Sequence, residues 1–170
     1  MKFKSAFICL VAVSCAFSLG SCIKEKPSGV ELQVGDFLPD FEVIMNDGRT
    51  ETGENLRKGP SCVVFFHTSC PDCQQALPSL QRIYDEFADS LAIVLISREQ
   101  SADEINAYWT EQGFTMPYSA QLTREVYEKF AQERVPRIYL SPAGGQIQAI
   151  FTDSPVPSYD VLLEQVNRIL

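Results

Sequence analysis

After residue 60, the pattern of hydrophobic and polar positions changes from that of a buried strand to that of a helix and then back to that of a buried strand. Residues 61–67 and 91–97 are continuous apolar runs of strand length, rich in β-branched residues, which is typical of strands buried on both faces. Between them, apolar residues recur at helical spacing: Ala76, Leu77, Leu80, Ile83, Tyr84 and Phe87. The order strand, helix, strand predicts two parallel strands joined by a right-handed crossover.

Three further helices are expected toward the C-terminus. Residues 101–104, Ser-Ala-Asp-Glu, form a capping box for a helix that runs to about Gln112 and stops at Gly113. A second helix is expected over residues 123–132, and Ser158 is expected to cap the last one. The apolar face of that last helix is formed by Val161, Leu162, Val166 and Ile169.

Shorter patterns predict the remaining strands. Residues 41–45 alternate enough for an edge strand, and Asn-Asp-Gly at 46–48 follows as a turn. Residues 137–141 and 146–152 are expected to form a hairpin through Pro-Ala-Gly-Gly at 142–145. A parallel pair combined with an antiparallel hairpin predicts an α/β fold with a mixed central sheet flanked by helices on both faces.

The N-terminus has the pattern of a signal peptide. Lys2 and Lys4 precede a short apolar run at 6–19, whereas a transmembrane helix needs about 20 apolar residues. The ending Leu-Gly-Ser-Cys resembles a bacterial lipobox, in which the cysteine is acylated, so residues 1–21 are the expected lipoprotein signal and Cys22 the expected lipidation site. The alternative is an ordinary signal with a chance cysteine.

A lipid at Cys22 would determine where the protein is located and which cysteines remain as thiols. Residues 22–33 are short and polar and are expected to tether the protein to a membrane of the bacterial cell envelope, inner or outer, with the domain on the extracytoplasmic side. Disulfides are permitted there. Of six cysteines, those left as thiols would be Cys62, Cys70 and Cys73.

Charge narrows the classes of partner. The formal net charge at pH 7 is −8, and loss of Lys2 and Lys4 with the signal would make it more negative. An acidic domain of this kind argues against nucleic acid or an anionic lipid surface as a partner.

The cysteines stand in a context that resembles a known family. Cys70 and Cys73 open a helix directly after a buried strand, Pro78 lies five residues after the second cysteine, and Val135-Pro136 precedes a later strand. This arrangement resembles the thioredoxin fold, and residues 34–50 resemble the opening of its membrane-tethered TlpA/ResA-like branch. The resemblance implies a thioredoxin-like domain over residues 34–170, in which Val135 and Pro136 form a cis-proline loop that lines the substrate groove.

The chemistry of a helix start explains the position of the thiols. Disulfide exchange proceeds by thiolate attack, and the unpaired N–H groups and dipole of a helix N-terminus stabilise a thiolate. Cys70 is therefore the expected attacking sulfur and Cys73 the resolving one. A disulfide serving only stability is disfavoured, because so short a loop would contribute only about 2 kcal/mol. A metal site would need about four ligands, so no metal is expected, and no organic cofactor is implied.

Neighbouring residues could tune this pair. His67, the only histidine, is a candidate modulator of the thiolate, although it could simply end the strand beside the site. Asp72 opposes negative charge on Cys70 and is the second candidate modulator, favouring a reductant with a potential below about −150 mV. The branch often has glutamate at the position of Ala76, so a proton acceptor is missing here. Cys62 is expected to be an inert buried thiol.

The sequence thus predicts a lipid-anchored thiol-disulfide oxidoreductase whose partners are protein thiols and disulfides. The resemblance adds a membrane electron donor as a partner. One alternative is a tethered binding module with incidental cysteines. Another is a peroxiredoxin, whose Pro-x-x-x-Thr-x-x-Cys pattern is broken here by Val63 and His67.

Overall fold

The computed structural model describes residues 29–170. The predicted signal peptide, the lipidation at Cys22 and most of the predicted tether lie outside these residues. Glu31 and Leu32, near the start of the described part, already contact the domain: Leu32 N–H donates to Phe130 O at 2.9 Å, and Glu31 pairs with Arg137 at 2.8 Å. None of the helices in the described part is long and apolar enough to cross a membrane.

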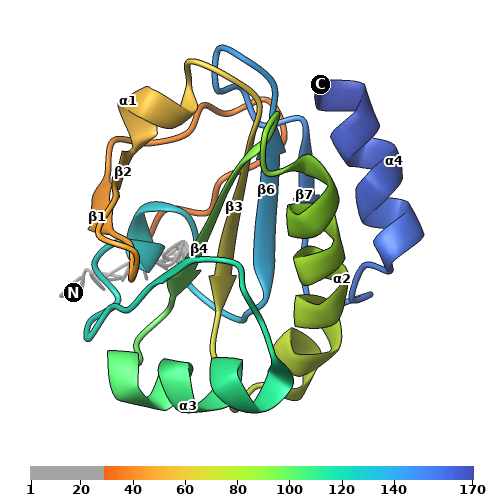
Figure 1. Cartoon of the computed structure of the whole chain (residues 1–170). Helices are drawn as coiled ribbons and strands as arrows, with labels where there is room; N and C mark the ends of the chain where they lie inside the picture. The colour runs from red at the N-terminus through yellow and green to blue at the C-terminus, as the bar shows by residue number, and fades with distance from the viewer. Residues whose placement is uncertain (1–28) are drawn as a thin grey trace, which may run out of the picture.

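A mixed five-stranded sheet forms the centre of the molecule (Figure 1). The spatial order is β5-β4-β3-β6-β7. β3 pairs in parallel with β4, as the crossover pattern predicts, and antiparallel with β6. β4 pairs in parallel with β5, and β6 antiparallel with β7. The bounds are β3 Ser61–Phe66, β4 Ala92–Ser97, β5 Tyr118–Ser119, β6 Arg137–Ser141 and β7 Ala149–Phe151.

The central position of β3 follows from its sequence. Every residue of this strand is buried, and successive side chains point to opposite faces of the sheet. The Phe65 ring packs against Tyr127 at 5.3 Å between centroids, whereas Phe66 packs against Trp109 at 5.0 Å. Both faces are covered, so the strand is apolar except for Ser61, whose buried hydroxyl lies 2.9 Å from that of Ser141. The buried strands predicted at 61–67 and 91–97 are confirmed as β3 and β4, each one residue shorter than the predicted run.

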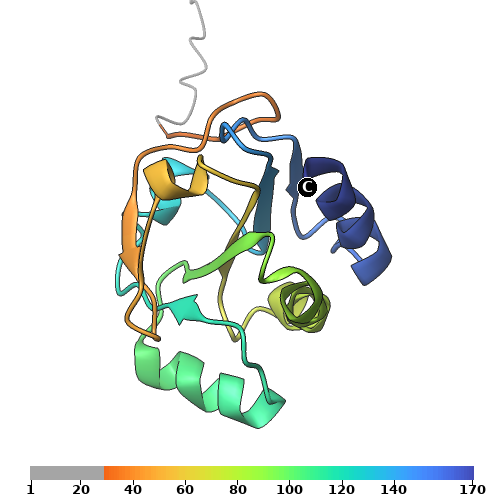
Figure 2. The same ribbon diagram turned by 45° about the horizontal axis from the view of Figure 1, so that its top comes forward.

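Helices and a small hairpin cover the sheet. α2 and α4 lie side by side on one face, while α1 and the β1–β2 hairpin lie on the other (Figure 2). α3 lies at the β5 edge, where Trp109 contacts Tyr118 at 5.1 Å. The bounds are β1 Glu42–Ile44, β2 Thr50–Thr52, α1 Gly53–Leu56, α2 Pro71–Phe87, α3 Ala102–Gln112 and α4 Tyr159–Ile169.

The predicted helix ends are confirmed where capping residues mark them. Ser101 and Glu104 form both hydrogen bonds of the capping box at the start of α3, and Gly113 ends that helix with a left-handed φ of 69°. Ser158 Oγ accepts from Val161 N–H at 3.4 Å at the start of α4. Val161 itself is 44% exposed, so its assignment to the apolar face of α4 is wrong.

The helix predicted over residues 123–132 is wrong. Only Tyr127–Lys129 form a single 3₁₀ turn, η1. Tertiary contacts compete for its backbone: Phe130 O accepts from Leu32 N–H at 2.9 Å and from the Tyr139 hydroxyl at 3.3 Å. The buried rings of Tyr127 and Phe130 pack onto β3 instead of forming a helical stripe. Strands β2 and β5, of three and two residues, were not predicted.

Candidate active site

Cys70 lies where β3 passes into α2. It is the N-cap residue of α2, and its backbone N–H donates to His67 O at 3.0 Å across the connecting turn. An N-cap side chain usually accepts a hydrogen bond from the first helical N–H groups, but no side chain does so here. The Cys70 thiol instead donates to Val135 O at 3.3 Å. Deprotonated, this sulfur would be an acceptor placed where a helix start favours negative charge.

Cys73 follows one turn later and is fully buried. Burial raises the pKa of the Cys73 thiol, and the nearby Cys70 and Asp72 add to this shift because negative charge on either would oppose a second thiolate. Cys70, by contrast, is partly exposed, and all three cysteines of residues 29–170 are free thiols. The structure therefore pairs an accessible sulfur with a protonated one behind it.

The Val135-Pro136 loop reaches the cysteines from β6. Both residues are buried, and the peptide bond between them is cis. Tyr127 in η1 fixes the loop, because its hydroxyl donates to Arg134 O at 2.6 Å. Arg134 has a left-handed φ of 70°, which is uncommon for a residue other than glycine. The loop brings Val135 O to Cys70 across 65 positions of sequence.

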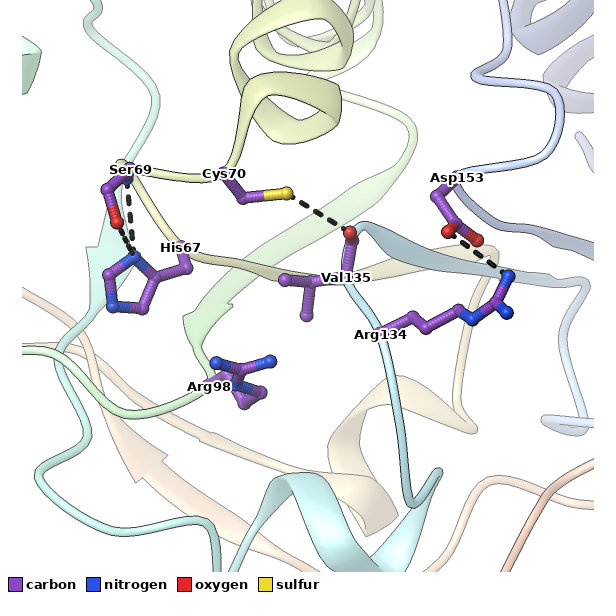
Figure 3. Close-up of a pocket in the computed structure, with 7 residues that line it drawn as sticks. All are labelled: His67, Ser69, Cys70, Arg98, Arg134, Val135 and Asp153. Atoms are coloured by element: carbon purple, nitrogen blue, oxygen red, sulfur yellow. Dashed lines mark hydrogen bonds and ion pairs between the residues drawn. The ribbon is translucent and has the colours of Figure 1, made fainter.

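An open cavity of about 350 Å³ lies beside the Cys70 sulfur (Figure 3). Residues from four parts of the chain line it: the β3–α2 turn, the end of β4, the Val135 loop and the segment after β7. These residues are His67, Ser69, Cys70, Arg98, Arg134, Val135 and Asp153. The attacking sulfur predicted from the sequence is therefore open to a substrate.

The two candidate modulators occupy different positions. His67 lines the cavity, and its Nδ1 accepts from Ser69 N–H at 3.2 Å and lies 2.9 Å from Ser69 Oγ. That contact directs Nδ1 toward the turn and away from Cys70 (Figure 3). Asp72 lies in the first turn of α2 and acts on the buried Cys73. A modulating role for either residue stays a prediction.

Gln100 holds the active-site turn from below, and the sequence reasoning missed it. Its side chain is 6% exposed and contacts Thr68 twice: its Oε1 accepts from Thr68 N–H at 3.0 Å, and its Nε2 donates to Thr68 Oγ1 at 2.5 Å. Gln74 donates to Thr68 O at 2.7 Å. The available signal was topological, because residues just after two adjacent parallel strands meet at one edge of the sheet.

Replacing Gln100 with leucine should loosen this turn. The change leaves the buried N–H and hydroxyl of Thr68 without partners, so the free energy of unfolding should fall by about 1–3 kcal/mol. Urea unfolding followed by circular dichroism measures this. Gln75→Leu, an exposed change on α2, is the matched control and should shift stability by less than about 0.5 kcal/mol. Equal losses in the two variants would contradict the role of Gln100.

Cys62 should make stability fall at high pH. Burial raises the pKa of this thiol to about 12, while in the unfolded chain it ionises near 9. Above pH 9 the unfolded state releases a proton that the folded state keeps, so stability falls by about 1.4 kcal/mol for each pH unit. Cys62→Val removes this contribution. The stability difference between wild type and Cys62→Val should therefore be constant at pH 7–8 and change between pH 9 and 10.5, and parallel curves would contradict it.

The site contains few groups that could hold a metal. Within residues 29–170 no three His, Cys, Asp or Glu side chains cluster with the geometry of a metal site. The polar side-chain groups at the cavity are one thiol, one imidazole, one hydroxyl, two guanidinium groups and one carboxylate.

Two proteins of Bacillus subtilis are similar to this chain in sequence. The thioredoxin-like protein YneN of Bacillus subtilis is 28% identical over 91 residues, covering 52% of this chain and 54% of that relative. This chain therefore spans about half the length of YneN. The thiol-disulfide oxidoreductase YkuV of Bacillus subtilis is 23% identical over 129 residues, covering 73% of this chain and 86% of YkuV.

A solved structure supports the fold assignment. The solution structure of a protein from Bacteroides thetaiotaomicron superposes with a TM-score of 0.77 at 22% identity, covering 84% of this chain and 92% of that one. The predicted thioredoxin-like α/β fold is confirmed. Residues 34–151, which contain both cysteines and the Val135-Pro136 loop, match the family described as AhpC/TSA, and the chain belongs to this thioredoxin-like family.

Proposed function

We propose that the protein is a thiol-disulfide oxidoreductase that reduces disulfides of other polypeptides through Cys70 and Cys73. One observation carries this proposal: the thiol of Cys70 is partly exposed at the N-terminus of α2, and the buried thiol of Cys73 follows one turn later. The relative YkuV, which is named for the same activity, supports it. Cys62, the third free thiol of residues 29–170, is buried and lacks such access.

The reaction begins with attack of the Cys70 thiolate on a substrate disulfide. The substrate S–S bond breaks, a Cys70–substrate S–S bond forms, and the leaving thiolate takes a proton. Cys73 then gives up its proton and attacks the Cys70 sulfur, which releases the second substrate thiol. The substrate gains two electrons and two protons, and the pair becomes a disulfide. A dithiol reductant must then restore both thiols.

Two features support the direction of reduction and the binding of extended peptide. Burial raises the pKa of Cys73 and so disfavours a thiolate there. A strong oxidant, by contrast, has a stabilised reduced form, so this site favours a reductant. When Cys70 is deprotonated, Val135 O loses its thiol partner and can accept an N–H of a substrate strand. In our proposal Val135 and Pro136 form the substrate groove, and a dithiol donor in the membrane resets the pair.

The location is part of the proposal. Cys22 is the acylated residue, residues 22–33 are the tether, and the domain of residues 34–170 faces the extracytoplasmic side of the cell envelope. Globomycin treatment of expressing cells, which blocks cleavage of lipoprotein signals, should cause the precursor to accumulate, and Cys22→Ala should abolish membrane association. A Cys22→Ala protein that stays in the membrane fraction would contradict the lipid anchor.

Insulin reduction driven by dithiothreitol tests the activity. Wild type and Cys62→Ala should accelerate precipitation of the insulin B chain, whereas Cys70→Ser should not. Equal turnover in wild type and Cys70→Ser would favour a binding module with incidental cysteines. Rapid consumption of hydrogen peroxide without disulfide reduction would instead favour a peroxiredoxin, which the family match makes worth measuring in the same preparation.

A further inference from the structure

Arg98 lies at the end of β4 and lines the same cavity as the attacking sulfur. It follows directly after β4, and its backbone N–H donates to Phe66 O at the end of β3 at 2.8 Å. The ends of two parallel strands meet at one edge of a sheet, so Arg98 and Cys70 line the same cavity. Figure 3 shows the guanidinium group of Arg98 between His67 and Val135.

The positive charge of Arg98 is only partly neutralised in the described part of the chain. Its Nη2 lies 3.0 Å from Glu99 Oε1, and Arg124 binds the same oxygen. The hydrogen bond from Arg124 holds the pKa of Glu99 down at about 2, so this carboxylate is ionised at all ordinary pH values. A single carboxylate therefore serves two guanidinium groups, and a net positive charge remains.

Arg98 also carries a free hydrogen-bond donor. Its Nε is buried and has no hydrogen-bond partner among residues 29–170, while the side chain as a whole is 23% exposed. Buried donors are almost always paired, because leaving one unpaired costs free energy. Nε itself has almost no exposed surface, so an acceptor that enters the open cavity would meet the exposed part of the Arg98 side chain.

Other groups at the cavity do not supply that acceptor. Asp153 is the only carboxylate lining it, and it pairs with Arg134 at 3.4 Å. The Nδ1 acceptor of His67 faces Ser69. The cavity is thus locally basic in a chain whose formal net charge is −8, so the positive charge there is a feature of the site and not of the surface in general.

We propose that Arg98 forms a carboxylate-binding subsite, which selects polypeptides that carry Asp or Glu beside the disulfide attacked by Cys70. This proposal rests on the proposed oxidoreductase function and names its substrate class. An arginine that donates to a carboxylate forms a charge-assisted hydrogen bond, stronger than one between neutral groups. The bound carboxylate would pair with the exposed part of the Arg98 guanidinium group and hold the substrate sulfur next to Cys70.

Disulfide-linked peptide pairs that differ only in Asp or Asn beside the cysteine test the subsite. Wild type should reduce the Asp peptide with a kcat/KM about tenfold higher than that of the Asn peptide. Arg98→Gln should bring this ratio close to one. Arg168→Gln, which removes an exposed arginine of α4, should keep the wild-type ratio. A wild-type ratio near one, or an unchanged ratio in Arg98→Gln, would overturn the proposal.

A measurement on wild type alone covers the case in which Arg98→Gln does not fold. The Asp-to-Asn ratio should shrink when sodium chloride rises from about 0.02 to about 0.5 M, because salt screens the ion pair. A ratio that is independent of salt would overturn the subsite. Glutathione disulfide serves as a small-molecule substrate for comparison. If the protein reduced it faster than the Asp peptide, the assignment to polypeptides would be overturned. Reduction of none of these probes would instead refute the oxidoreductase function itself.

Discussion

Cys73→Ser should lower turnover by roughly 10³-fold or more and leave Cys70 in a mixed disulfide with its substrate. In wild type the second thiol attacks from one helical turn away, and such intramolecular reactions have effective concentrations of roughly 10⁵ M or more. Without that thiol, the mixed disulfide is released only by external thiols at millimolar concentration. Cys70 keeps its access to the cavity, so the first attack still occurs. Non-reducing electrophoresis and mass spectrometry of the captured species measure the result.

Cys70→Ser is the matched control for the trap. It retains Cys73, which is fully buried, so it should form no mixed disulfide under the same conditions. Adding Cys62→Ala to the Cys73→Ser protein should leave the trap intact, because Cys62 is buried in β3. Mixed disulfides at Cys73 in the Cys70→Ser protein would show that the roles of the two sulfurs are reversed. In cells that express the Cys73→Ser protein, the trapped species identify the natural substrates.

The parts of the fold that sequence predicted are those with a strong local cause. The continuous apolar runs predicted β3 and β4 because burial on both faces favours apolar residues at successive positions of a strand. The capping box at Ser101 predicted the start of α3 to the residue. Residues 123–132 contain good helix formers, but long-range bonds to Phe130 O outweigh that local preference, and only η1 forms.

The candidate site divides in the same way. Cys70 and Cys73 are close in sequence, so a strand-to-helix junction was enough to place them. Arg98, Gln100 and Asp153 reach the site only through pairing of the strands, and their sequence neighbours carry no recognised motif. The number of strands between two elements and the direction of each strand decide such contacts. Arg98 and Gln100 could have been identified from the sequence, because they directly follow β4, whose carboxyl end lies beside that of β3.

Ala76 occupies the position at which the TlpA/ResA-like branch often has glutamate, and replacing it with glutamate should strongly lower stability. Ala76 lies on the same face of α2 as Cys73, and both side chains are fully buried. Ala76→Glu would place a carboxyl group in a closed part of the core. At pH 7 it must either lose its hydration as a carboxylate or hold a proton that the unfolded chain releases, and either costs several kcal/mol beyond the overpacking of about 1–3 kcal/mol. We therefore expect a large fall in the free energy of unfolding at pH 7, measured by urea denaturation.

Ala76→Gln separates the charge from the added volume. Burial raises the pKa of the new carboxyl group above its unfolded value of about 4.3, so the folded state keeps a proton that the unfolded state releases as pH rises. The two variants should be equally stable near pH 4, and Ala76→Glu should become the less stable one as pH rises to 7. Equal stability at pH 7 would mean that the carboxylate reaches water at the Cys70 cavity. In that case a carboxylate at position 76 could accept the proton that Cys73 gives up, a role that Ala76 cannot fill.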